Sequence, residues 1–312
     1  MIKIANAPCS WGILEFDLEG ESAGFEQVLD EMKETGYAGT ELGDWGFMPS
    51  EPIALRAELE KRSLEMVGAF VPVALADPAA HAAGVENAVR TADLMASSGY
   101  SSAFLVLADN NGSIPERTAN AGRVTPEMGL DDSGWKAFAE GADLVAAAVR
   151  AKTGLRTVFH HHCGGYVETP GEISRFLELT DPDLVGLVFD TGHFRFGGGD
   201  PLAGLREYYD RIRHVHFKDC DQLIALESAE LRRDYFESVN AGIFCELGKG
   251  CVDFHSIAGE LKSREYEGWI VVEQDVLPGM GAPLVCAKRN REYLLSLGLS
   301  GAIDFGLINI EV

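Results

Sequence analysis

The stretch WKAFAEGADLVAAAVRAKTGLRTVFHHH, residues 135–162, joins two different patterns within one unit of the chain. Its first part places apolar residues at the three- and four-residue spacing of an amphipathic helix, and Gly154 ends that spacing. Its second part, residues 157–162, is a short β-branched and aromatic run that closes with three histidines. A helix followed at once by a strand is the repeating unit of parallel sheets. The stretch therefore predicts an α/β fold.

The same unit recurs along the chain. Strands are expected at residues 2–8, 38–43, 65–72, 103–109, 157–162, 184–190, 212–219 and 269–275. Helical spacing lies between them, for example at 24–36, 84–99, 135–154 and 287–298. Eight such units in a 312-residue chain fit a closed (β/α)8 barrel, or TIM barrel, better than an open doubly wound sheet. No GxGxxG turn follows the first strand, and a P-loop motif is also absent, so a nucleotide-binding sheet is not supported.

No linker divides the chain, so we expect one barrel domain over residues 1–300 and a C-terminal extension at 301–312 with no assigned role. Two connections are longer than the others, at 109–133 after the fourth strand and at 219–252 after the seventh. Long loops that follow barrel strands are where TIM-barrel enzymes build their active sites. These two connections are therefore expected at the mouth of the site.

The charge and composition exclude several classes of partner. A net charge of −23 argues against binding to nucleic acid or to an anionic membrane surface, because both are polyanions. No stretch approaches the roughly 20 apolar residues that span a bilayer, and the N-terminal MIKIANAPCSWG has too short an apolar run for a signal peptide. The 6 cysteines form no CxxC pair and are expected to be free thiols in a reducing compartment, which predicts a cytoplasmic protein.

Polar side chains gather where the last four predicted strands end. These are His160, His161 and His162 in the fifth, Asp190 with His193 just beyond the sixth, His214, His216 and Lys218 along the seventh, and Glu273 in the eighth. Because side chains alternate along a strand, the His214, His216 and Lys218 row is expected to point into the barrel. Asp190 and Glu273 hold the last inward positions of their strands.

Carboxylates and imidazoles that converge from adjacent strands require a compensating cation, because buried like charges are costly. Asp190, His216 and Glu273 make a set that suits a divalent metal such as Mn²⁺, Co²⁺, Mg²⁺ or Zn²⁺. The sequence therefore predicts a divalent metal centre at the carboxyl-terminal mouth of the barrel.

Seven motifs together resemble those of the xylose-isomerase-like barrel superfamily of sugar isomerases, epimerases and dehydratases, and most nearly its inosose (2-keto-myo-inositol) dehydratase branch. They are APCSWG at 7–12, GYAGTELGDWGFMP at 36–49, FHHHCGGYVET at 159–169, FDTGHF at 189–194, RHVHFKD at 213–219, ELGKGCVDF at 246–254 and NREYLLSLGL at 290–299. The resemblance spans nearly the whole chain. It implies metal ligands at Asp190, His216 and Glu273, with manganese or cobalt favoured.

The same resemblance implies a fourth ligand, a glutamate at the end of strand five. We expect Glu168 there, returned to the rim by the Gly164–Gly165 turn, with His162 as the substitute ligand. The histidine run is thus expected to line the site. His193 matches a family position that contacts a substrate oxygen.

The implied substrate is a small polyhydroxylated ketone. A metal on its carbonyl and neighbouring hydroxyl acidifies the C–H between them. Lys218 and His162 are the candidate base and acid, and Glu41 and His193 the orienting groups. If the acid protonates a β-hydroxyl, water leaves; if the proton returns on the other face, the product is an epimer.

Further residues are candidates for contact with the substrate. Trp11 and Trp45 would form an apolar wall against the substrate ring, or would serve only in packing at the rim of the barrel. His160 and Asp219 are further candidates for substrate contact. Lys218 beside Asp219 could instead form a plain ion pair.

Alternative functions share most of these residues. A metal-dependent keto-sugar isomerase or epimerase would use all of them, although the SWG and HFKD motifs favour the dehydratase. A non-catalytic sugar-binding barrel would predict a degraded metal set. An endonuclease IV-like barrel needs a basic surface facing DNA, which the charge of −23 excludes. Barrels of this kind often form homo-oligomers, but no interface signature is evident in the sequence.

Overall fold

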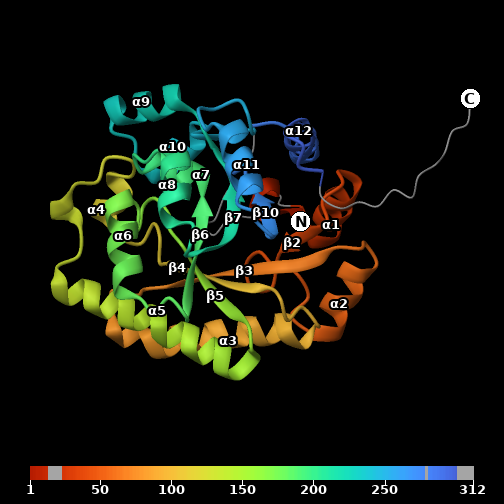
Figure 1. Ribbon diagram of the computed structural model, residues 1–312, viewed down its shortest axis with the longest axis horizontal. Coiled ribbons are helices and arrows are strands. Elements are labelled where there is room, and N and C mark those ends of the chain that lie inside the picture. The colour runs from red at the N-terminus through yellow and green to blue at the C-terminus, as the bar shows by residue number, and fades with distance from the viewer. Residues whose placement is uncertain (13–22, 278–279, 301–312) are drawn as a thin grey trace, which may run out of the picture.

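Eight parallel strands close into a barrel in the computed structural model, which describes residues 1–12, 23–277 and 280–300 (Figure 1). The barrel order is β1-β10-β7-β6-β5-β4-β3-β2. The strands are β1 Ile2–Asn6, β2 Gly39–Glu41, β3 Glu65–Val73, β4 Phe104–Asp109, β5 Arg156–His160, β6 Val185–Asp190, β7 Ile212–Phe217 and β10 Gly268–Val272. This architecture confirms the predicted single-domain TIM barrel. The extension expected at 301–312 lies outside the described residues.

Eight helices of the described residues pack around the barrel. They are α1 Phe25–Glu34, α2 Pro52–Glu60, α3 His81–Ser97, α5 Asp132–Thr153, α6 Pro170–Leu179, α8 Pro201–Tyr208, α11 Phe254–Ser263 and α12 Pro283–Ser296. Figure 1 shows α3 and α5 running side by side along one edge of the molecule. Each of the four helical segments expected from apolar spacing overlaps one of these helices. No helix in the described part of the chain is long and apolar enough to cross a membrane.

Short elements fill the loops at the carboxyl end of the barrel. The loop after β4 holds α4 Pro115–Ala119 and the 3-10 turn η3 Pro126–Met128. The loop after β7 holds β8 Asp219–Cys220, α9 Gln222–Leu231, α10 Tyr235–Asn240 and β9 Phe244–Cys245, and β8 pairs with β9 in antiparallel fashion. The short helix α7 Thr191–Phe196 follows β6 directly, and two further 3-10 turns are η1 Pro8–Trp11 and η2 Pro78–Ala80.

Side-chain alternation divides each strand between two cores. On β7, Val215 and Phe217 point outward into the apolar layer under the helices, where Phe217 packs on Phe254 of α11 with ring centroids 4.9 Å apart. On β6, Val188 points inward and joins a small apolar cluster inside the barrel. At the carboxyl end, beyond this cluster, the inward face carries His160, Asp190 and His216. The fold therefore brings these polar side chains together at the carboxyl-terminal mouth.

Candidate functional site

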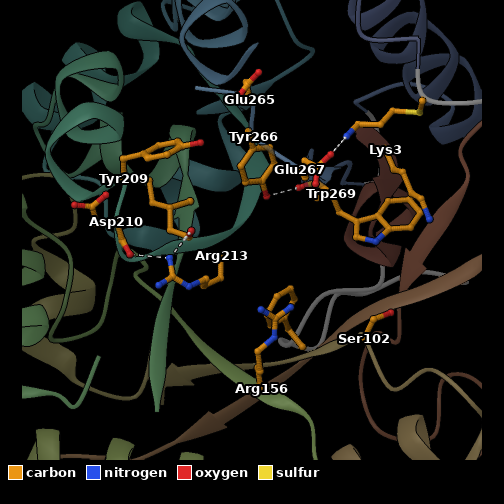
Figure 2. A pocket seen from close by; sticks show the side chains of 14 residues that line it. Lys3, Ser102, Arg156, Tyr209, Asp210, Arg213, Glu265, Tyr266, Glu267 and Trp269 are labelled. Atoms are coloured by element: carbon orange, nitrogen blue, oxygen red, sulfur yellow. Dashed lines mark hydrogen bonds and ion pairs between the residues drawn. The ribbon is translucent and has the colours of Figure 1, made fainter. Parts of the chain in front are cut away.

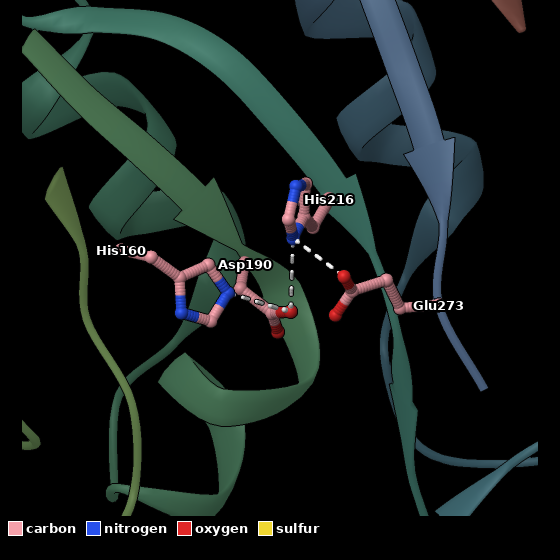
Figure 3. A group of neighbouring side chains, drawn as sticks. All are labelled: His160, Asp190, His216 and Glu273. Atoms are coloured by element: carbon pink, nitrogen blue, oxygen red, sulfur yellow. Dashed lines mark ion pairs between the residues drawn. The ribbon is translucent and has the colours of Figure 1, made fainter. Parts of the chain in front are cut away.

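Four side chains from adjacent strands converge at the carboxyl end of the barrel: His160 of β5, Asp190 of β6, His216 of β7 and Glu273 just after β10. Figure 3 shows them pointing toward one another. Asp190 Oδ2 lies 3.6 Å from His160 Nε2 and 3.9 Å from His216 Nδ1, and His216 Nδ1 lies 3.3 Å from Glu273 Oε1. Three of the four predicted ligands are therefore together, with His160 in the fourth position.

These residues fit a divalent cation because their facing atoms have no other partner. His160 Nε2, His216 Nδ1 and Asp190 Oδ2 are buried, and no hydrogen bond satisfies them among the described residues. Buried polar atoms are rarely left unpaired, so an orphaned set that faces one point indicates a missing ligand. Donor atoms that share one ion at about 2.1 Å lie roughly 3 to 3.5 Å apart, close to the observed spacing. Burial also lowers the pKa of His160 to about 3, so this imidazole is neutral and able to coordinate.

Glu41 at the end of β2 fixes the orientation of His216 from the other side. Its Oε1 accepts hydrogen bonds from His216 Nε2 at 3.1 Å and from His214 Nε2 at 2.9 Å. Burial opposes ionisation of Glu41, but the two histidines outweigh it and hold its pKa at about 2. With a carboxylate on Nε2, the other nitrogen, His216 Nδ1, faces Asp190 and Glu273. The predicted orienting residue thus lies in contact with a member of the metal group.

Glu168, the predicted fourth ligand, is not brought to this group. Its side chain is fully buried, and its two oxygens accept hydrogen bonds from the backbone N–H of Gly122 at 2.7 Å and of Gly164 at 2.9 Å. Gly164 has a φ of +84°, a conformation that favours glycine and turns this loop. Burial raises the pKa of Glu168 to about 7, although both amides favour the carboxylate. Glu168 therefore joins the loop after β4 to the loop after β5, and His160 takes the fourth place in the group that could hold a metal.

Replacing Glu168 with Gln tests this reassignment. A carboxamide can accept from only one of the two amides and presents an N–H to the other, so Glu168→Gln should lower the free energy of unfolding by about 1–3 kcal/mol. Metal stoichiometry should stay unchanged. Urea unfolding and metal analysis of the purified variant measure the two effects. A folded variant that has lost its metal would restore Glu168 as a ligand.

The three histidines of the run divide between the two faces of β5. His160 and His162 line the hollow above the metal group, together with Lys218. His161 points the other way, where its Nε2 accepts a hydrogen bond at 3.2 Å from the backbone N–H of Asp190. His193 lies against His162, with ring centroids 3.8 Å apart. Alternation along the strand had predicted that His160 and His162 share a face.

Lys218 pairs with carboxylates of the last strand and not with its neighbour Asp219. Its Nζ lies 3.0 Å from Asp275 Oδ1 and 3.4 Å from Glu273 Oε2. Burial opposes the charged form, but Asp275, Glu273 and Asp190 outweigh it and hold the pKa of Lys218 well above its usual range. Lys218 is therefore an ammonium ion next to the metal group.

Three other predicted contacts are not at the hollow, because each side chain has a partner elsewhere. The indole N–H of Trp11 donates to Glu31 of α1 at 2.6 Å, which buries the ring against that helix. Trp45 is 41% exposed and lies under Arg90. Asp219 accepts backbone N–H groups from Cys220, Gly248, Gly250 and Val252, so it is a loop anchor.

The hollow also contains residues that the sequence analysis did not select. Phe70 of β3, Tyr235 of α10 and Asp275 line it. Asp275 lies two positions beyond Glu273, so strand alternation could have indicated it. Tyr235 comes from the long loop after β7, where no periodic pattern points to the site.

A second hollow lies at the opposite, amino-terminal end of the barrel (Figure 2). Two of its cations rest on aromatic rings, with Lys3 Nζ 4.9 Å from the Trp269 centroid and the Arg156 guanidinium 4.5 Å from that of Phe104. Its described lining includes neither a histidine nor a member of the metal group. TIM barrels keep their reactive groups at the carboxyl end, where the metal group lies, so we place the site there.

Comparison with known proteins identifies the family of the chain. The model of the xylose isomerase-like TIM barrel family matches residues 29–293. An inosose dehydratase of Geobacillus kaustophilus is 34% identical over 294 residues, covering 94% of this chain and 93% of the relative. One from Lacticaseibacillus casei is 31% identical, covering 94% of this chain and 96% of the relative. The solved D-allulose 3-epimerase of a Methylomonas species superposes with a TM-score of 0.67 at 17% identity, covering 95% of this chain and 98% of that one, which shows the same fold. The chain therefore belongs to the xylose isomerase-like TIM barrel family.

Proposed function

We propose that this chain is a metal-dependent hydro-lyase that removes water from a keto-inositol such as 2-keto-myo-inositol. The observation that carries the proposal is the set of buried, unpaired donor atoms of His160, Asp190 and His216, beside Glu273. The similarity to inosose dehydratases over 94% of the chain supports the substrate class. Mn²⁺ and Co²⁺ are the ions we propose first.

His160, Asp190, His216 and Glu273 would hold the cation. When bound, a divalent ion supplies Lewis-acid polarisation of a substrate carbonyl, which acidifies the neighbouring C–H. The remaining chemistry belongs to side chains of the chain itself. It requires one group that accepts the carbon-bound proton and another that gives a proton to the departing hydroxyl.

We propose that His162 accepts the proton. Its Nδ1 lies 2.7 Å from the carbonyl oxygen of Cys163, which can only accept, so Nδ1 carries the hydrogen and Nε2 carries the lone pair. Burial lowers the pKa of His162, which leaves its Nε2 unprotonated. Tyr235 Oη lies 3.3 Å from Nε2 and steadies the ring. We therefore assign His162 as the base.

We propose that Lys218 donates the second proton. As an ammonium ion held by Asp275 and Glu273, it stands at the hollow with protons to give. An ammonium ion has no lone pair that could accept a carbon-bound proton. The sequence indicated Lys218 as the candidate base and His162 as the candidate acid, and the ammonium form of Lys218 favours the reverse order. We therefore propose Lys218 as the acid, and its proton leaves with the hydroxyl as water.

The direct test uses protein stripped with a chelator and reloaded with Mn²⁺ or Co²⁺. It is incubated with 2-keto-myo-inositol in D₂O, and the products are read by mass spectrometry. Loss of one water that depends on the metal supports the dehydratase. Deuterium uptake without loss of water would instead indicate an isomerase or epimerase. No reaction with the reloaded protein would reject this substrate.

A further inference from the structure

Two cysteines that play no part in the proposed chemistry lie side by side next to the site. Cys220 ends β8 and is buried, whereas Cys251 lies between β9 and α11 and is partly exposed. The backbone N–H of Cys251 donates to the carbonyl oxygen of Cys220 at 2.9 Å. A disulfide needs neighbouring backbones of this kind. The two cysteines are thus neighbours, and both thiols are free.

The backbone around this pair is held firmly before any bond forms between the sulfurs. Asp219 accepts N–H groups from Gly248 at 2.8 Å, from Gly250 at 2.9 Å and from Val252 at 3.1 Å. A Cβ on Gly250 would lie 2.3 Å from Asp219 Oδ1, so the loop can approach β8 this closely only with glycine. Asp219, the predicted substrate contact, therefore serves to bring Cys251 to Cys220.

A cation beside Cys251 favours its reactive form. Arg195 of α7 donates from Nε to the sulfur of Cys251 at 3.3 Å. The hydrogen bond from Cys220, and then Arg195, lower the pKa of the Cys251 thiol to about 6. The thiolate is the nucleophile in cysteine chemistry, and an adjacent arginine is a known means of stabilising it. The position of Arg195 therefore favours the thiolate form of Cys251.

The other cysteines lack this activation. Burial raises the pKa of Cys9, Cys163 and Cys286, and it raises the pKa of Cys245 to about 12. The pKa of Cys220 is also raised, first by its hydrogen bond to Cys251. Only Cys251 of the six cysteines therefore combines partial exposure with a stabilised thiolate.

We propose that Cys251 is a modification site for hydroperoxides and that Cys220 resolves the product as a disulfide. The Cys251 thiolate attacks one peroxide oxygen, the O–O bond breaks, and the sulfur becomes a sulfenic acid while the other oxygen leaves as hydroxide or alkoxide. Cys220 then attacks the sulfenic sulfur. The S–S bond forms, the S–O bond breaks, and the released hydroxide takes the Cys220 proton to become water. Two thiols are oxidised and one peroxide is reduced, independently of the proposed function.

The test treats the reduced full chain with a small excess of hydrogen peroxide at neutral pH and maps its peptides without reduction. We expect a linked peptide that joins Cys220 to Cys251. Cys251→Ser should abolish it, whereas Cys220→Ser should leave a sulfenic acid on Cys251 that dimedone traps. Cys245→Ser, which changes the cysteine opposite Asp219 on β9, should leave the linked peptide intact. Oxidation of Cys245 or Cys163 at the same rate as Cys251 would overturn the proposal.

Arg195→Met tests the activation of Cys251. If the two cysteines had only a structural role, this variant would leave the pH dependence of Cys251 alkylation unchanged. The rate of Cys251 alkylation by iodoacetamide should rise with pH to a midpoint near 6 in the parent chain. Loss of the guanidinium should raise that midpoint by about 1 pH unit or more. An unchanged midpoint in a folded variant would remove Arg195 from the proposal, and a parent midpoint near that of a free thiol would overturn it.

Discussion

Asp190→Asn is expected to remove the bound metal and to lower turnover of the keto-inositol by roughly 10³-fold or more, because the cation's contribution to such chemistry is several kcal/mol. Asp190 Oδ2 faces both His160 and His216 at the centre of the metal group, and an amide contributes no negative charge there. The fold should survive. Asp190 Oδ1 caps α7 by accepting the N–H of His193 at 2.7 Å, and Asn is an equally good cap.

Metal content by elemental analysis and turnover with added Mn²⁺ check this expectation. Asp109→Asn is the matched control, since Asp109 is a buried carboxylate at the end of β4 that lies outside the metal group. That variant should keep its metal. Full metal content and full turnover in Asp190→Asn would reject the metal mechanism, whereas loss of metal in both variants would show only that buried rim carboxylates support the fold.

The inward direction of His214, His216 and Lys218 was predictable, because the alternation of side chains along a strand depends only on neighbouring residues. His214 and His216 reach across the barrel to Glu41, while Val215 and Phe217 join the outer core, as the two-residue period of β7 requires. The barrel itself followed from the same regularity repeated eight times. Asp190, His216 and Glu273 meet because parallel strands end at one edge.

The fourth ligand was not predictable in the same way. Whether Glu168 returns to the rim depends on where the loop after β5 folds, and the N–H of Gly122, from the loop after β4, helps to decide that. Trp11 and Asp219 show the same limit, since their partners Glu31 and Gly248 lie in other segments of the chain. Local periodicity carries no information about such partners. The sequence prediction therefore failed where the position of a side chain depends on contacts between loops.

Lys218→Gln is expected to lower the rate of dehydration by about 10²- to 10⁴-fold, the usual contribution of a general acid. The metal group should remain loaded, because Lys218 is not one of its members. His162 keeps its lone pair at Nε2 in this variant, so the carbon-bound proton should still exchange with solvent. The variant should thus take up deuterium from D₂O while losing little water.

This separation of exchange from water loss distinguishes the two proposed roles. His162→Gln should abolish exchange and dehydration together, because removal of the proton precedes departure of the hydroxyl. Lys249→Gln, at an exposed lysine that pairs with Glu246 at 2.6 Å, is the matched control and should change neither rate. If Lys218→Gln lost exchange as completely as dehydration, Lys218 would act at the first proton transfer. The ammonium form that its buried carboxylate neighbours favour would then have to give up its proton before the substrate reacts.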